Sequence, residues 1–155
     1  MKRLLNLKAR SVVILYILID IICVGAGMGL PLFCIILGFP LGWYIAERVS
    51  ASAGNLYQKY YKIFRFSFLA TLFTFLLMLI VWGRTIIMLF DPSADFSNFG
   101  HPFILYDPKI SFIGWQILMM IISPFLQLLA TIFGAFITLM RIEAKSHSPH
   151  SGKQK

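Results

Sequence analysis

The chain has 155 residues, of which 59% are apolar and 13% are charged, and its formal net charge is +8. Soluble domains average about half apolar and a quarter charged residues. The excess is contiguous, because 68–82 and 117–140 contain no charged residue. These runs are apolar on all sides, which excludes a membrane β-barrel, whose strands alternate apolar and polar residues. The basic residues flank the apolar runs, a pattern typical of membrane proteins and not of nucleic-acid binding.

The first apolar run, 12–46, is too long for one straight membrane helix. Its 35 residues would measure about 52 Å, against a hydrocarbon core of roughly 30 Å. The segment 25–31 reads GAGMGLP, and its Gly and Pro residues favour a turn. We therefore expect helices at about 12–27 and 30–46. Both are short for a membrane span, so a re-entrant hairpin is the alternative.

The segment 47–65 separates this hairpin from the next apolar run. Its aromatic residues share a helical face and are flanked by basic residues: Tyr57, Tyr60, Tyr61 and Phe64, with Lys59, Lys62 and Arg65. This pattern suits a short helix lying at the membrane surface. The alternative is that the segment forms the first solvated turns of the following helix, with its long basic side chains reaching water.

Two further helices are expected, at about 66–90 and 110–140. The segment between them contains two Asp-Pro pairs and one His-Pro pair, which favour turns. Pro124 lacks a backbone N–H and is expected to kink the last helix. The polar segment 144–155 is expected to be a disordered cytoplasmic tail, so that residues 1–143 form a single transmembrane helical domain.

The distribution of Lys and Arg predicts the orientation. With four spans and the N-terminus inside, 12 of the 14 basic residues lie on the cytoplasmic side, as the positive-inside rule expects. Three spans would divide them between the two sides, whereas a re-entrant hairpin at 12–46 gives the same placement as two spans. We predict an all-α integral membrane protein with four transmembrane helices in two antiparallel hairpins. It would be a multi-pass protein of the cell (cytoplasmic) membrane, with both termini cytoplasmic.

Asp20 is the most unusual residue of the sequence, because it lies inside the first apolar run. An Asp at the centre of a transmembrane helix costs about 2.5–3.5 kcal/mol on insertion scales, and it usually faces the interior of the bundle. It shares one helical face with Tyr16, Cys23 and Gly27, at spacings of four, three and four. Asp20 is therefore either a hydrogen-bonded group that holds helices together or the carboxylate of a proton or substrate path.

Two other predicted helices carry polar and small residues at the same spacing. These are Ser67, Thr71, Thr74 and Met78 in the third helix, and Gln116, Met120, Ser123, Gln127, Thr131, Gly134 and Thr138 in the fourth. Such residues face other helices in membrane bundles. We therefore place Asp20, Gln116, Ser123 and Gln127 in the bundle interior as candidate functional residues, with helix packing as the simpler explanation.

Gly38 and Gly42 form a G-x-x-x-G face on the second helix, interrupted by Pro40. This motif permits close helix approach, to another helix of the chain or to a second copy.

Other chemistry-bearing residues do not form a recognised site. The outer loop carries Asp91, Asp95, His101 and Asp107, for which turn formation is a better explanation than metal binding. The two cysteines lie in apolar segments and have no partner at metal-ligand spacing. Since no hydrolase, nucleotide, zinc or haem pattern occurs, we expect no catalytic site, metal or cofactor.

The sequence thus favours a non-enzymatic accessory or subunit protein that acts through helix–helix contacts. Its partners would be the lipid bilayer and other membrane subunits, or further copies of itself, and not nucleic acid. The alternative is a small proton-coupled transporter or channel with Asp20 as the coupling carboxylate. A packing role predicts that Asp20→Asn lowers stability in detergent without changing flux, whereas a coupling role predicts that it abolishes proton-linked transport in protein that still folds.

Overall fold

The computed structural model describes residues 9–26, 32–52, 55–100 and 105–147. In chain order its elements are α2 (Ala9–Ala26), α3 (Leu32–Ser50), α4 (Leu56–Ile87), the 3-10 turn η1 (Met88–Phe90), α5 (Pro108–Ile117), the π-helical turn η2 (Leu118–Ile122) and α6 (Ser123–His147). Every regular element within the described residues is a helix, which confirms the all-α part of the predicted fold class.

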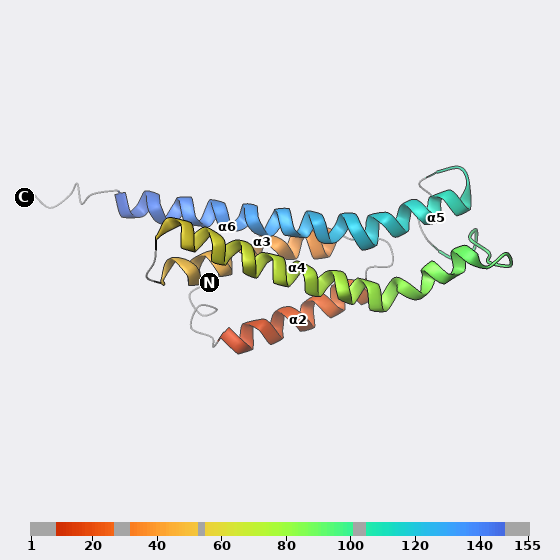
Figure 1. Cartoon of the computed structure of the whole chain (residues 1–155), viewed down its shortest axis with the longest axis horizontal. Coiled ribbons are helices and arrows are strands. Elements are labelled where there is room, and N and C mark those ends of the chain that lie inside the picture. Colours follow the sequence, from red (N-terminus) through yellow and green to blue (C-terminus); the bar gives the residue numbers. More distant parts are fainter. Residues whose placement is uncertain (1–8, 27–31, 53–54, 101–104, 148–155) are drawn as a thin grey trace, which may run out of the picture.

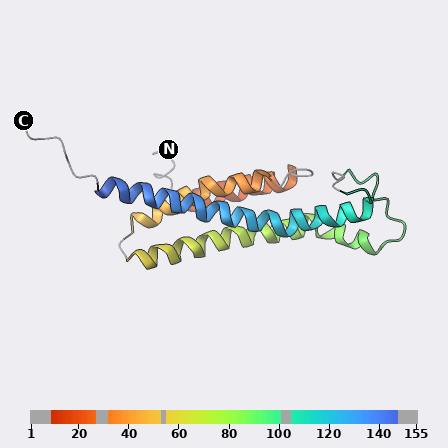
Figure 2. The ribbon, with the colours of Figure 1, turned by 90° about the horizontal axis from the view of Figure 1, so that it is seen from above.

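The helices lie side by side, and α2, α3, α4 and the rod that begins with α5 and ends with α6 run in alternating directions (Figure 1). α4 and the continuous rod of α5, η2 and α6 extend along most of the molecule, whereas α2 and α3 are shorter (Figures 1 and 2). α3 makes its most extensive contact with α6, and α2 lies at the side of the bundle against α3 and α4. The start of α2 and the end of α6 therefore lie towards the same end of the molecule (Figure 1).

Among the described residues, three helices are long and apolar enough to cross a membrane: Leu32–Ser50, Leu56–Phe90 and Pro108–Lys145. At 1.5 Å per residue the first measures about 28 Å, close to the roughly 30 Å of a hydrocarbon core. The other two have 35 and 38 residues and measure about 52 and 57 Å. Both exceed the thickness of a hydrocarbon core, so each can extend past it into the interface.

The largest difference from the predicted helix bounds is at 47–65. α3 continues to Ser50 and α4 begins at Leu56, so the connection is only 51–55. The basic and aromatic stretch therefore forms the first turns of α4, and it is not a separate surface helix. The physical reason is continuity, because 56–65 contains no Gly or Pro that would end the helix.

Smaller differences occur at the two ends of the chain. α2 begins at Ala9, three residues before the predicted start, and α6 reaches His147, so 144–147 is helical where a tail was predicted. The rest of that tail, 148–155, and most of the predicted turn at 25–31 lie outside the described residues.

A π turn lies just before Pro124, the residue at which the sequence predicts a kink. Residues 118–122 are π-helical, and the N–H of Ser123 donates to the carbonyl of Leu118, five residues earlier. Pro124 has no N–H to give to the carbonyl of Met120, so regular α-helical bonding cannot continue through this point. A π turn accommodates such an interruption within an otherwise continuous helix.

The buried apolar residues form two clusters along the bundle. One contains Val24, Cys34, Met78, Trp82, Phe112, Trp115, Met119 and Met120, and the other contains Ile45, Ala46, Val49, Ile63, Ala135 and Leu139. Trp82 and Trp115 meet edge to face, with ring centroids 5.5 Å apart. Outside the clusters many large apolar side chains are exposed, as Ile80 is to 74% and Ile22 to 67%.

Glycine residues allow the backbones of α3 and α6 to come into direct contact. A Cβ on Gly38 would lie 2.7 Å from the carbonyl oxygen of Gln127, and one on Gly42 would collide with the carbonyl of Thr131. On the opposite helix, a Cβ on Gly134 would lie 2.8 Å from the carbonyl oxygen of Phe39. Gly38 and Gly42 thus pack against α6 of the same chain. This contact places the backbone of Gln127 next to α3.

Candidate functional site

Asp20 is fully buried on the side of α2 that faces α4. The hydroxyl of Thr74, which is also fully buried, donates to Asp20 Oδ2 at 2.8 Å. The neighbouring α2 residues Ile19, Ile21 and Ile22 are exposed, so α2 presents apolar side chains outward and its carboxylate inward. This is the orientation expected of an ionisable residue in a membrane helix.

The contact between Asp20 and Thr74 belongs to a longer chain of hydrogen bonds. The Tyr16 hydroxyl lies 3.0 Å from Thr74 Oγ1 and 3.3 Å from the carbonyl oxygen of Ala70. Gln127 Nε2 donates to the Tyr16 hydroxyl oxygen at 3.0 Å. The chain therefore joins three helices, with Asp20 and Tyr16 on α2, Thr74 on α4 and Gln127 on α6.

Both hydroxyls of this chain have two possible acceptors. Tyr16 can donate to Thr74 Oγ1 or to the carbonyl oxygen of Ala70, and Thr74 can donate to Asp20 Oδ2 or to the same carbonyl oxygen, at 3.2 Å. Each hydroxyl has one proton to donate. In the arrangement in which Tyr16 donates to Thr74 and Thr74 to Asp20, the donors from Gln127 onward point towards the carboxyl group, and aligned donors strengthen the interaction at the terminal acceptor.

Two acceptors of the chain remain without a hydrogen-bond partner among the described residues. These are Asp20 Oδ1 and Gln127 Oε1, and both atoms are buried. A buried acceptor that lacks a partner costs on the order of 1–3 kcal/mol. Asp20 is thus held through one oxygen, while the other has capacity for a further donor.

The remaining candidates lie outside this network. Gln116 on α5 is buried, and its Nε2 donates to Thr85 Oγ1 near the end of α4. Ser123 is fully buried at the first position of α6, directly after the π turn. The structure thus joins Asp20 to Gln127 through Tyr16 and Thr74, and it gives Gln116 a separate partner.

Tyr16 and Thr74 are the members of this network that the sequence analysis did not select as candidates. Both occur in the polar and small-residue faces of their predicted helices, and Tyr16 lies one turn before Asp20. The spacing indicated that each faces the interior. It did not indicate that a residue of one face hydrogen-bonds a particular residue of another.

The carboxylates between α4 and α5 are engaged in local turns. Asp91 Oδ1 accepts from the backbone N–H and the hydroxyl of Ser93, at 2.9 and 2.6 Å, and these hydrogen bonds lower the pKa of Asp91. Asp95 accepts from Asn98 in the same way. Asp107 caps α5 by accepting from the N–H of Ile110 at 3.0 Å.

Neither metal nor disulfide chemistry is indicated among the described residues. They include no group of three His, Cys, Asp or Glu side chains that could hold a metal ion, and His101 lies outside them. Cys23 and Cys34 are free thiols, the second of them buried.

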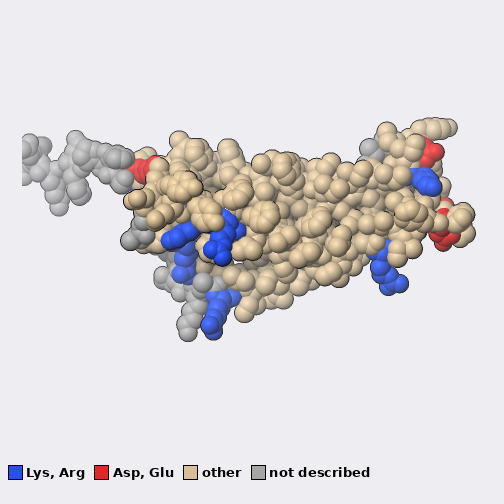
Figure 3. Space-filling view, viewed as in Figure 1, with Lys and Arg blue, Asp and Glu red and all other residues tan. Residues whose placement is uncertain are grey.

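Charged residues gather at the two ends of the molecule and leave its middle uncharged at the surface (Figure 3). The end formed by the start of α2, the end of α3, the start of α4 and the end of α6 is basic. Its described charged residues are Arg10, Arg48, Lys59, Lys62, Arg65, Arg141 and Lys145, against Glu47 and Glu143. The opposite end combines Arg84 and Lys109 with Asp91, Asp95 and Asp107.

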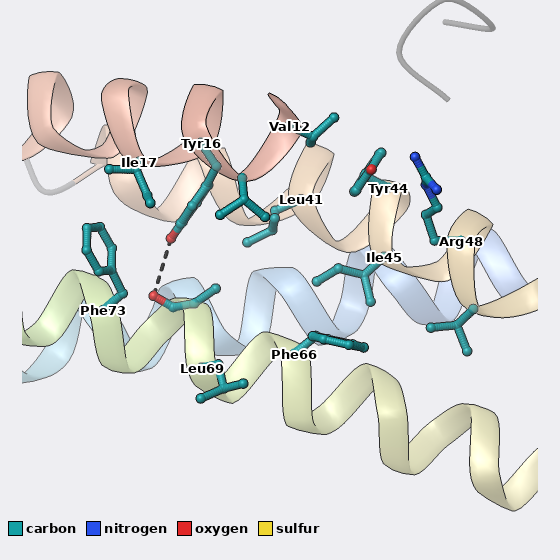
Figure 4. A pocket seen from close by; sticks show the side chains of 13 residues that line it. Val12, Tyr16, Ile17, Leu41, Tyr44, Ile45, Arg48, Phe66, Leu69 and Phe73 are labelled. Atoms are coloured by element: carbon teal, nitrogen blue, oxygen red, sulfur yellow. Dashed lines mark hydrogen bonds between the residues drawn. The ribbon is translucent and has the colours of Figure 1, made fainter. Parts of the chain in front are cut away.

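Four pockets in the described part of the chain have almost entirely apolar walls. Asp20, Gln116, Ser123 and Gln127 line none of these four. Tyr16 lines one of them, a groove of about 460 Å³ between α2, α3 and α4, and its hydroxyl points towards Ala70 on the α4 wall of the same groove (Figure 4).

Comparison with protein-family models, curated proteins and solved structures found no match.

Proposed function

We propose that the chain is a multi-pass membrane protein with four spans and with both termini on the cytoplasmic side. Three helices with the necessary length and apolar composition support the membrane location. The exposed apolar side chains along α2, α4 and α6 also support it, because soluble proteins rarely expose contiguous apolar patches of more than a few hundred Å². The basic end would face the cytoplasm, as the positive-inside rule expects.

α2 would be the fourth span. Its 18 residues measure about 27 Å, and its two charges are Arg10 at the start and the buried Asp20. A thin bilayer or snorkelling by Arg10 would accommodate this length. A re-entrant arrangement of α2 and α3 is the competing topology. A cysteine introduced at Gly25, at the far end of α2, should be labelled by a membrane-impermeant maleimide from the outer side only if α2 crosses.

The proposed role is that of a non-enzymatic accessory or subunit protein acting through helix–helix contacts. The observation that supports this role concerns the hydrogen-bond partners of the polar side chains in the interior. Asp20, Thr74, Tyr16 and Gln127 bond to one another between helices, and the four apolar pockets do not reach Asp20. Such an interior holds helices together, as interhelical hydrogen bonds do in membrane bundles.

Photo-crosslinking in native membranes tests the contact role. A benzophenone amino acid would be placed at exposed positions on three helices, Ile22, Ile80 and Phe133, with the buried Val24 as the control. We expect a discrete crosslinked product with another membrane protein or a second copy from at least one exposed position, and none from Val24. Crosslinks to lipid alone at all three exposed positions would contradict the role.

A proton-coupled transporter is the second candidate, and one observation favours it. The hydrogen-bonded chain leads to Asp20, and one of its members, Tyr16, lines the groove at the basic end. Proteoliposomes with an internal pH dye and an imposed pH gradient distinguish the two roles. We expect wild type and Asp20→Asn to match empty vesicles. Wild-type proton flux that disappears in Asp20→Asn would establish the transporter and overturn the accessory role.

A further inference from the structure

The groove at the basic end is too large to be a packing defect. It occupies about 460 Å³ between α2, α3 and α4, within the range of roughly 300–1,000 Å³ typical of small-molecule sites. Thirteen side chains line it, and Arg48 is the one charged residue among them (Figure 4). The ribbons of α2 and α4 diverge towards the start of α2 (Figure 1), and the groove is lined by residues of both helices in this region.

The walls of the groove favour a hydrocarbon chain as its occupant. A narrow, flexible chain fits a space between three helices that contact one another, and the apolar walls formed by Ile17, Leu41, Phe66, Leu69 and Phe73 match such a chain chemically. A protein helix with its side chains is about 10–12 Å wide, and it would have to separate α2 from α4, which the contact between Tyr16 and Thr74 holds together.

Charge indicates which headgroup such a chain would carry. Arg48 lines the groove near the end of α3, and its guanidinium lies 5.5 Å from the centroid of the Tyr44 ring. The surrounding end of the molecule is strongly basic (Figure 3). No acidic residue lines the groove among the described side chains. An Arg guanidinium matches a phosphate in geometry as well as in charge.

We propose that the groove is a binding site for an anionic phospholipid. One acyl chain lies between α2 and α4 and ends near Tyr16, and the phosphate is bound by Arg48. The lipid completes the packing of α2 against the bundle on the side where the protein leaves it open. This inference rests on the proposed membrane location, and it holds for either topology of α2 and α3.

Native mass spectrometry of the delipidated full-length protein tests the proposal. Phosphatidylglycerol and phosphatidylcholine with identical acyl chains would be added in turn, and the bound fractions compared. We expect a preference for phosphatidylglycerol that Arg48→Gln reduces about fivefold. Arg65→Gln is the matched control, because Arg65 is exposed at the same end but does not line the groove.

A second pair of variants tests occupancy of the groove itself. Leu69→Trp would fill it from α4, whereas Leu76→Trp adds the same bulk two turns along the same face of α4, outside the groove. We expect only Leu69→Trp to abolish retention of the lipid. Equal binding by these two variants, or equal binding by Arg48→Gln and Arg65→Gln, would overturn the proposal.

Extraction of native membranes with alkaline carbonate separates failure of this inference from failure of the membrane location. Wild-type protein that dissolves would refute the membrane location, and the lipid site with it. Protein that stays in the membrane but shows no preference between the two lipids would refute the lipid site alone.

Discussion

Replacing Thr74 by valine removes the central hydroxyl of the buried network while nearly conserving the side-chain volume. Thr74 donates to Asp20 and lies within hydrogen-bond distance of Tyr16. Without it, neither oxygen of Asp20 has a partner among the described residues, since Oδ1 already lacks one. A buried acceptor left unpaired costs about 1–3 kcal/mol, and interhelical hydrogen bonds measured in a membrane protein reach about 1.7 kcal/mol. We expect Thr74→Val to lower the free energy of unfolding by about 1–2 kcal/mol.

Thr71 provides a matched control on the same helix. Its hydroxyl is buried but has no hydrogen-bond partner among the described residues, so Thr71→Val removes an unpaired polar group. The expected change is within about 0.5 kcal/mol of zero or slightly stabilising. Both variants would be unfolded by increasing SDS in mixed micelles and followed by far-UV circular dichroism. Equal destabilisation by the two substitutions would refute the assignment of the network.

The same assay measures the interaction energy between Thr74 and Asp20. Asn at position 20 keeps an oxygen that can accept from Thr74, so the structure leads us to expect a milder effect for Asp20→Asn than for Asp20→Ala. In the Asp20→Ala background, Thr74→Val should cost less than it does in wild type, because its acceptor has gone. Additive effects in this double-mutant cycle would show that the two side chains do not interact.

Three further predictions concern other parts of the molecule. Gly42→Ala should destabilise the protein by about 1–3 kcal/mol, because its Cβ would collide with the α6 backbone. Gly83→Ala, whose nearest neighbour would be 3.9 Å away, should be neutral or stabilise by up to about 1 kcal/mol; similar SDS midpoints for the two variants would contradict this. The pKa of Asp91 is lowered by its hydrogen bonds to Ser93, so its contribution to the turn is present above the ordinary carboxyl pKa and is lost as pH falls through the lowered value. Carboxyl NMR titration should show the Asp91 pKa rising in Ser93→Ala, and an unchanged value would refute the assignment. Removing the α5 cap by Asp107→Ala should cost about 1 kcal/mol and speed amide exchange of Ile110, whereas unchanged exchange would argue against the cap.

The helices could be predicted from the sequence because an apolar run of sufficient length has few other stable forms. Their ends were less predictable, because composition shows where the apolar residues end, and a helix can continue beyond that point through polar residues. The stretch 56–65 is polar enough to resemble a loop, yet it continues α4 without interruption. The π turn at 118–122 depends on how the helix accommodates Pro124, which the residue type alone does not determine.

The candidate site was predictable residue by residue but not as an assembly. Periodicity placed Asp20 and Gln127 on inward faces, and the structure buries both side chains. Which faces meet depends on the rotation and axial shift of three helices, and those are determined by close contacts such as Gly38 against the backbone of Gln127. Gln116 lies on the same predicted face as Gln127, but it belongs to the part of the rod before the π turn and bonds to Thr85 instead.

The π turn has a consequence for insertions and deletions in the last helical rod. It separates Gln116, which contacts Thr85, from Gln127, which contacts Tyr16. A π turn contains one residue more than an α-helical turn, because its hydrogen bond spans five residues and not four. Deleting one residue from 118–122 would therefore regularise the helix and leave its two halves close to their present orientation, so both glutamine contacts could survive. The same deletion between the two glutamines but outside the π turn would rotate one half against the other by about 100°, and only one of the contacts could then be kept.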